Sequence, residues 1–223
     1  MFSSSKTSFA TGLAAVMHAA GLFGTTLGWD GLFSRLTPFN LLTMLVLLIW
    51  TLPEKNKKVL VFFIAAFLAG MISETIGVHT GLLFGHYRYG DSLGLKLFEV
   101  PLLIGVNWFV VVYAAGMCAQ SFRTWIATRW INSGKAAYSK WIGASVVIDG
   151  ALIATLFDFL MEPGAVRLGF WTWNDSAIPP LNYLSWFGVS LLLMFLFQKL
   201  QFKTHRFAVH LLLIQALFFL AVR

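Results

Sequence analysis

The chain has 223 residues, of which 58% are hydrophobic, 16% aromatic and only 11% charged, and its formal net charge is +7. Soluble domains carry about 25% charged residues, so this chain lacks the polar groups that cover a globular surface; we exclude a cytosolic enzyme, a secreted disulfide scaffold and a disordered tail. The single cysteine, Cys118, excludes an internal disulfide and a thiolate-cluster metal site.

Long apolar stretches predict an all-α, multi-pass membrane bundle of about seven transmembrane helices, forming a single integral membrane domain over residues 1–223. In chain order the expected spans are 8–28, 38–52, 59–78, 100–119, 141–160, 181–197 and 207–222. The second span is the shortest. The first follows a single lysine and shows no small-residue cleavage site, so we expect a retained helix rather than a signal peptide.

Lysine and arginine residues gather after the second, fourth and sixth expected spans, within 55–58, 123–140 and 199–206. With seven spans these loops lie on one side, and the positive-inside rule makes that side cytoplasmic. The N-terminus is then cytoplasmic and the C-terminus external. The loops on the other side, near 79–99 and 161–180, hold many of the aromatic, proline and acidic residues, so we expect the chemistry there.

An internal repeat relates the third and fourth spans to the fifth and sixth. Residues 84 positions apart are Glu74 and Asp158, Gly85 and Gly169, Tyr87 and Trp171, and Tyr89 and Trp173; residues 78 apart are Pro101 and Pro179, and Trp108 and Trp186. We interpret these matches as a parallel duplication with halves at about 59–119 and 141–199, related by an axis along the membrane normal.

The repeat places one carboxylate from each half, Glu74 and Asp158, at equivalent depth in the outer third of the membrane. Glu162 follows Asp158 by one turn on the same helix face, whereas Asp149 is expected on the opposite face near the middle of the membrane. Carboxyl groups in hydrocarbon are costly, so they mark a functional site or bond across helices. A proton donor beside a proton acceptor is the chemistry that such a group of acids supports.

Aromatic and amide side chains lie close to these acids in the sequence. The alternating Tyr87, Tyr89, Trp171 and Trp173 fit the mouth of a cavity whose π faces stabilise a cation, and the alternative is an aromatic belt at the membrane interface. The remaining candidates for substrate binding are Asn107, Trp108, Asn182, Trp186 and His79. The asparagines either orient water or bond between helices. His79, in the outer loop, either shuttles protons or contacts lipid headgroups.

Several cofactor and metal chemistries have no motif in the chain. It contains no pair of Asp-rich motifs for magnesium and a diphosphate, no histidine box and no glycine-rich dinucleotide fingerprint. His18 and His210 lack the second matched pair or attachment motif that a haem site would need. We therefore expect acid–base chemistry on a lipid-soluble substrate, with no cofactor and no metal.

Five segments carry a resemblance to a known family: 74–89, 98–102, 158–166, 169–173 and 178–183, with Glu74, Asp158 and Glu162 inside them. The chain resembles the carotenoid biosynthesis membrane protein family, whose characterised members are carotenoid 1,2-hydratases of the bisanhydrobacterioruberin hydratase kind. The resemblance implies a hydro-lyase that adds water to the terminal C1=C2 bond of a linear carotenoid, in the bacterial cytoplasmic (inner) membrane. It implies a linear carotenoid and membrane lipid as partners, other carotenoid-pathway enzymes as candidates, and no nucleic acid.

Two other functions remain open at this point. A proton-initiated carotenoid cyclase would form the same cation and close a ring if water is excluded. Small membrane lycopene cyclases carry a Pro-x-Glu acid motif, whereas this chain reads Glu162-Pro163. A non-catalytic carotenoid or lipid carrier would need the aromatic cavity but not the buried acids.

Overall fold

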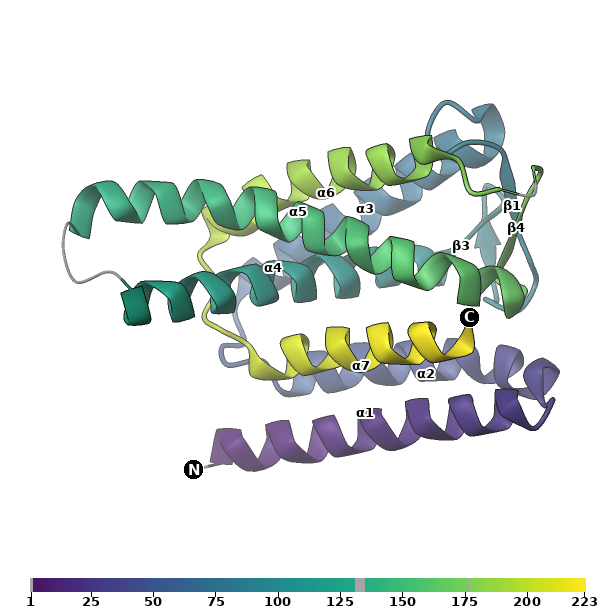
Figure 1. Cartoon of the computed structure of the whole chain (residues 1–223), viewed down its shortest axis with the longest axis horizontal. Helices are drawn as coiled ribbons and strands as arrows, with labels where there is room; N and C mark the ends of the chain where they lie inside the picture. Colours follow the sequence, from purple (N-terminus) through teal and green to yellow (C-terminus); the bar gives the residue numbers. More distant parts are fainter. Residues whose placement is uncertain (1, 131–134, 176) are drawn as a thin grey trace.

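The computed structural model describes residues 2–130, 135–175 and 177–223, and these form seven α-helices and four short strands. The helices are α1 (Phe2–Thr26), α2 (Asp30–Trp50), α3 (Lys57–Thr80), α4 (Leu102–Trp130), α5 (Lys135–Arg167), α6 (Pro180–Leu200) and α7 (Arg206–Val222) (Figure 1). The strands are β1 (Tyr87–Tyr89), β2 (Lys96–Leu97), β3 (Val100–Pro101) and β4 (Trp171–Trp173).

The prediction of an all-helical fold with seven helices is confirmed. Within the described part of the chain, five helices are long and apolar enough to cross a membrane: α1 to α4 and α6. Helix α7 has only 17 residues, and the described residues of α5 carry Asp149, Asp158 and Glu162. The predicted start of the second helix at residue 38 is wrong, because Pro38 lies inside a helix that begins at Asp30.

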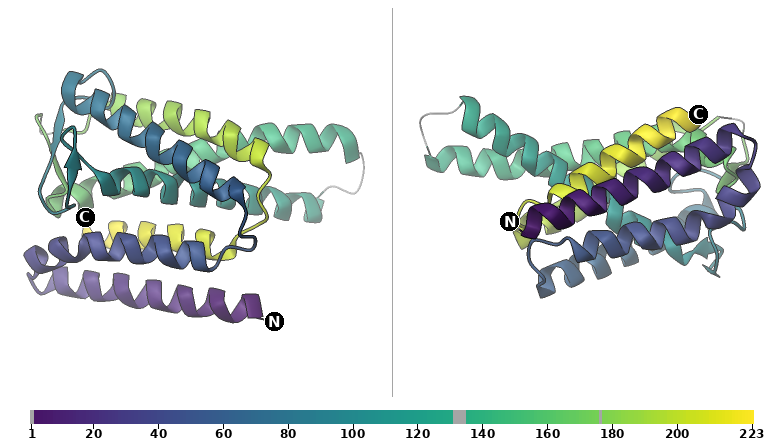
Figure 2. Two further views of the ribbon diagram at one scale, coloured as in Figure 1. Left: turned by 180° about the vertical axis from the view of Figure 1, so that it is seen from behind. Right: turned by 90° about the horizontal axis from the view of Figure 1, so that it is seen from below.

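The helices pack in two adjoining groups. Helices α3, α4, α5 and α6 form one group, and α1, α2 and α7 lie together along one side of it, as both views from opposite sides show (Figure 1 and Figure 2). Helix α7 joins the groups because it packs against α1, α4 and α5. It runs parallel to α1: the side chain of Thr11 bonds His210 at 2.9 Å, and the ring of His18 lies 5.6 Å from that of Phe218 further along both helices.

The connecting segments sort to the two ends of the bundle. The segments before α3 and before α7 lie at the end that holds the N-terminus, whereas the strands and the C-terminus lie at the other end (Figure 1). Helices α4 and α5 project beyond their neighbours at the first end (Figure 2). With 29 and 33 residues they are about 44 and 50 Å long. The expectation that Arg123 and Arg129 lie in a loop is therefore wrong, since both belong to α4.

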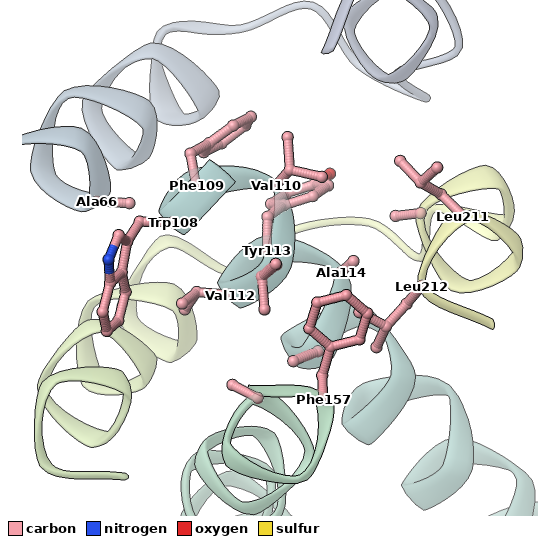
Figure 3. Close-up of a cluster of buried hydrophobic side chains, with 14 of the residues drawn as sticks. Ala66, Trp108, Phe109, Val110, Val112, Tyr113, Ala114, Phe157, Leu211 and Leu212 are labelled. Carbon is pink, nitrogen blue, oxygen red and sulfur yellow. The ribbon is translucent and has the colours of Figure 1, made fainter. Parts of the chain in front are cut away.

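Helix α4 forms the centre of the core, with 78% of its apolar stretch buried. Residues 108–115 of this helix are all buried, as expected for a helix that is apolar on every side. Its side chains meet Ala66 of α3, Phe157 of α5, and Leu211 and Leu212 of α7 (Figure 3). The central helix thus packs against helices of both groups.

Strands β1 and β4 join segments far apart in the sequence into one antiparallel ladder. The register pairs Tyr87 with Trp173, Arg88 with Thr172, and Tyr89 with Trp171. Successive side chains of a strand point to opposite faces, so the exposed Arg88 and Thr172 lie on one face and the four aromatic rings on the other. A second antiparallel pair, β2 with β3, leads into α4. The ladder therefore turns four aromatic side chains toward the helix bundle.

Candidate active site

Three buried carboxylates surround one small cavity beneath the β1–β4 ladder. Glu74 comes from α3, and Asp158 and Glu162 come from α5; their exposed fractions are 5%, 0% and 2%. We call this space the acid cavity; its lining consists of Glu74, Phe84, Tyr87, Tyr89, Ile104, Asn107, Trp108, Asp158, Met161, Glu162, Trp171, Trp173, Asn182 and Trp186. Its volume of about 20 Å³ is enough for a single water molecule.

Glu74 accepts hydrogen bonds from three aromatic side chains. Its Oε2 accepts from the hydroxyl groups of Tyr87 and Tyr89, the latter at 2.7 Å, and its Oε1 accepts from Trp108 Nε1 at 2.9 Å. The indole reaches α3 because Gly70 lacks a side chain: a Cβ at that position would lie 2.5 Å from the ring of Trp108. Three donors suit the acceptor-only ionised form of a carboxylate.

The hydroxyl groups of Tyr87 and Tyr89 stay protonated at neutral pH and donate hydrogen bonds. Burial, together with the nearby carboxylate of Glu74, raises the pKa of the Tyr87 and Tyr89 hydroxyl groups well above the ordinary value. Both hydroxyl groups therefore hold Glu74 in place without taking part as bases.

Glu162 and Asp158 carry fewer donors than Glu74. Trp171 Nε1 and Trp173 Nε1 both donate to Oε2 of Glu162 at 3.0 Å. Asn182 Nδ2 donates to Oδ2 of Asp158 at 2.7 Å and lies 3.5 Å from Oε1 of Glu162, so it bridges the two acids. Among the described residues, Oδ1 of Asp158 is buried without any hydrogen-bond partner. The acids thus differ: both oxygens of Glu74 accept close hydrogen bonds, whereas one oxygen of Asp158 has no partner among the described residues and Oε1 of Glu162 has only the 3.5 Å contact.

Aromatic faces form the remaining wall of the acid cavity. The indole rings of Trp108 and Trp186 stack with centroids 3.9 Å apart and an angle of 9° between their planes. Across the ladder, the rings of Tyr87 and Trp173 are 5.1 Å apart. A carbocation formed beside this space would lie near both π electrons and carboxylate oxygens.

A larger apolar cavity adjoins the acid cavity. It has a volume of about 320 Å³ and is lined by residues of α1, α2, α4, α5 and α7 and of the segments next to β2 and β4. The two cavities share Ile104, Asn107, Met161 and Trp171. A long apolar ligand could therefore reach the carboxylates through this shared wall, and we call the larger space the apolar cavity.

The structure brings eleven of the thirteen sequence candidates to the acid cavity and places the other two elsewhere. Asp149 lies outside it and forms an ion pair with Arg123 of α4, with Oδ2 at 2.5 Å from Nε. His79 is exposed in the last turn of α3. His18 and His210, the histidines considered for a haem site, do not share one site. His210 bonds Thr11, whereas His18 lines the apolar cavity.

Sequence reasoning missed the apolar lining residues. Phe84, Ile104 and Met161 line the acid cavity, and α1, α2 and α7 supply much of the apolar cavity. An apolar residue in a membrane span carries no signal that separates a cavity wall from a lipid-facing surface. Within 2–130, 135–175 and 177–223, no group of three or more His, Cys, Asp or Glu side chains is arranged to hold a metal ion.

Comparison with known proteins connects this geometry to a family. The family model described as "Carotenoid biosynthesis protein" matches residues 37–222. The chain belongs to the carotenoid biosynthesis protein family. Among curated proteins, this family member is 26% identical over 172 residues to the bisanhydrobacterioruberin hydratase of Haloarcula japonica, a match that covers 75% of the chain and 54% of the relative. The chain thus spans about half the length of that relative. No solved structure is significantly similar to this chain.

The resemblance read from the sequence motifs is therefore confirmed at the level of the family. The match includes every residue of the acid cavity, since all of them lie between positions 37 and 222. Buried acids, indole and phenol donors and a water-sized space together are suited to proton transfer to an apolar molecule.

Proposed function

We propose that the chain is a carotenoid hydratase that adds water across the terminal C1=C2 bond of a linear carotenoid. A proton is transferred to C2, the resulting tertiary cation at C1 is captured by water, and the water gives up a proton to a carboxylate. The sum is one water molecule added and a tertiary alcohol formed, with the catalytic acid restored when the proton returns to it. No redox change occurs.

The water-sized acid cavity carries this proposal. Its volume of about 20 Å³ holds one water between three carboxylates, which is what hydration needs and ring closure does not. The family supports a role in carotenoid biosynthesis, and the relative from Haloarcula japonica is named as a hydratase. The relative is 26% identical, and the match covers 54% of its length. The choice of a linear carotenoid as the substrate is therefore part of our proposal and is not taken from the name of the relative.

The hydrogen bonds divide the roles among the acids. We assign proton donation to Asp158, because among the described residues its Oδ1 has no partner that would compete for the proton. Glu162 is the base, since its Oε2 is held by Trp171 and Trp173 while Oε1 has only a long contact to Asn182. Glu74, held by its three donors, supplies a fixed negative charge beside the cation.

The apolar cavity is the proposed site of the reacting end group. The acid cavity is too small for a carotenoid end, whereas the apolar cavity of about 320 Å³ is of a size typical for ligand pockets. The shared residues Asn107 and Met161 lie where the double bond would approach the acids. Membrane lipid and other enzymes of the pathway are the proposed partners in delivering the substrate.

We also propose that the two halves, 59–119 and 141–199, arose by duplication. The β1–β4 register supports this, because its central pair, Arg88 and Thr172, has the same offset of 84 as Glu74 and Asp158. The stacked Trp108 and Trp186 are a second matched pair in direct contact.

For orientation we propose a cytoplasmic N-terminus in a bacterial inner membrane. The end of the bundle that holds the N-terminus also holds the basic segments 55–58 and 199–206. Reporter fusions test this: a cytoplasmic reporter should be active at the N-terminus and inactive at the C-terminus. The reverse pattern, or activity at both ends, would contradict seven spans in this orientation.

Pigment analysis of lycopene-producing cells tests the function. Cells that express the chain should accumulate products heavier by one or two waters, and Asp158→Asn and Glu74→Gln should abolish them at equal protein level in the membrane. A product of unchanged mass and altered retention would instead identify a cyclase. Unaltered lycopene in cells and with the purified protein would overturn the hydration of this end group.

A further inference from the structure

The apolar cavity contains buried polar atoms that the proposed reaction does not use. Gln215 of α7 is 4% exposed and lines the cavity, and its Oε1 has no hydrogen-bond partner among the described residues. Asn40 of α2 also lines the cavity, and its Oδ1 is buried and unpartnered within the same described part of the chain. Buried polar atoms are normally hydrogen-bonded, so two unused acceptors in one cavity indicate a ligand group.

His18 of α1 adds a third acceptor to the same cavity. Its Nδ1 lies 2.8 Å from the carbonyl oxygen of Ala14, which can only accept, so Nδ1 carries the proton. In a neutral imidazole, Nε2 is then an acceptor. The side chain is 7% exposed and its ring contacts Phe218, which places His18 beside α7 within one turn of Gln215.

The hydroxyl groups in the cavity wall are already used. Thr25 donates to the carbonyl oxygen of Leu22 at 2.8 Å, and Thr37 donates to that of Phe33 at 3.1 Å. Among the described residues, the buried wall atoms without a partner are the side-chain oxygens of Gln215 and Asn40, and a ligand group that donates a hydrogen bond would satisfy them. An O–H group on an otherwise apolar molecule has this chemistry.

These acceptors lie close to the reaction site. Phe219 of α7 contacts Phe157, the neighbour of Asp158. Gln215 precedes Phe219 by one turn, or about 6 Å along the helix. A linear carotenoid is about as long as the 30 Å membrane core is thick. The donor that reaches Gln215 therefore belongs to the end group inside the apolar cavity and not to the opposite end of the polyene.

We propose that Gln215, Asn40 and His18 form a subsite that binds a hydroxyl group on the carotenoid end group. The hydroxyl is either one that the substrate already carries on its reacting end or the one that hydration creates. The inference rests on the proposed function for the identity of the ligand as a carotenoid. It goes beyond that function because it names a recognition site outside the acid cavity.

Binding to an inactive protein tests the subsite without turnover. We would titrate full-length Asp158→Asn protein in lipid nanodiscs with lycopene and with the diol that hydration of both ends of lycopene gives. The diol should bind roughly tenfold more tightly than lycopene, as expected for one hydroxyl that satisfies a buried acceptor. Adding Gln215→Leu should remove this preference and leave lycopene affinity unchanged.

The control variant is Ser190→Ala, which removes another buried oxygen that has no partner among the described residues but does not line the apolar cavity. It should keep the preference for the diol. Gln215→Leu should unfold at the same temperature as its parent or at a higher one, because the substitution removes an amide whose oxygen has no partner among the described residues. If Gln215→Leu unfolds at a lower temperature, Gln215→Met replaces it in the binding experiment. Equal affinity of the parent for both carotenoids, or equal loss of both in Gln215→Leu, would overturn the subsite.

Turnover by the protein with Asp158 intact separates the two sources of the hydroxyl. If hydration creates it, the diol should inhibit lycopene hydration, and Gln215→Leu should relieve that inhibition about tenfold. If the substrate carries it, kcat/KM should be about tenfold higher for a carotenoid whose reacting end already bears a hydroxyl, and Gln215→Leu should remove the difference. Absence of any turnover, with the binding preference intact, would overturn the proposed function alone.

Discussion

Asp158→Asn removes a transferable proton from the acid cavity while it changes the shape of the side chain very little. The amide oxygen can still accept the 2.7 Å hydrogen bond from Asn182, so we expect the free energy of unfolding to change by no more than about 1 kcal/mol. Loss of a general acid lowers a rate by roughly 100- to 10,000-fold, which corresponds to about 3–5 kcal/mol in the activation free energy. The variant should therefore be folded and almost inactive.

The assay follows the formation of hydrated carotenoid by mass, with purified protein in nanodiscs and isotopically labelled water. Asp149→Asn is the matched control: it makes the same chemical change on the same helix, but Asp149 pairs with Arg123 outside the acid cavity. A partly exposed ion pair outside the acid cavity contributes about 1 kcal/mol or less, so this variant should retain the wild-type rate. Folded Asp158→Asn protein with more than a tenth of the wild-type rate would refute the assignment of Asp158 as the acid.

Three further changes test other parts of the structure. Tyr89→Phe removes one of the three donors of Glu74 and should lower the hydration rate about tenfold, measured by product formation, with little loss of stability. Gly70→Ala introduces a Cβ 2.5 Å from the ring of Trp108; the unfolding free energy should fall by about 1–3 kcal/mol, and the near-ultraviolet circular dichroism of the stacked indoles should change. Burial lowers the pKa of His205 to about 4, so the neutral form belongs to the native state and the protonated form to the unfolded chain. Stability due to this group is complete above pH 6.5 and is lost as pH falls from 6.5 to 4, by roughly 3 kcal/mol, in a pH series of unfolding measurements.

Each of these predictions has an outcome that contradicts it. Wild-type activity in Tyr89→Phe would mean that Glu74 needs no third donor. An unchanged dichroism spectrum in Gly70→Ala would show that α3 moves away and leaves the stack intact. For the third, His205→Gln should have a smaller acid loss than the wild type; identical slopes between pH 6.5 and 4 would assign that loss to other groups.

Polar residues made much of the site predictable from the sequence. Glu74, Asp158 and Glu162 stand out because charges are rare in membrane spans, and the alternating aromatic residues at 87–89 and 171–173 predict the mouth of a cavity. These are the residues that the structure brings together at the acid cavity. The pairing of segments 87–89 and 171–173 as strands was not predicted, because it depends on contacts between parts of the chain far apart in sequence.

The apolar cavity and the position of Asp149 were not predictable in the same way. Phe33 and Leu41 line the cavity, yet in the sequence they are indistinguishable from residues that face lipid. Asp149 was expected to be a candidate acid, but the rotation of α5 against α4 turns it toward Arg123, and that depends on the packing of two helices. Pro38 was interpreted as a helix start, although a proline is tolerated inside α2.

The charge balance of the acid cavity has a consequence for inhibition. Among the described residues that line it there are three carboxylates and no lysine, arginine or histidine. Such a space favours a nearby positive charge and disfavours a negative one, so a carotenoid analogue with a protonated or quaternary amine at the position of C1 would resemble the cation of the proposed hydration. Analogues that resemble a transition state bind far more tightly than substrates do. An amine placed at this one carbon should therefore be a strong inhibitor, whereas the neutral amide of the same shape should be weak.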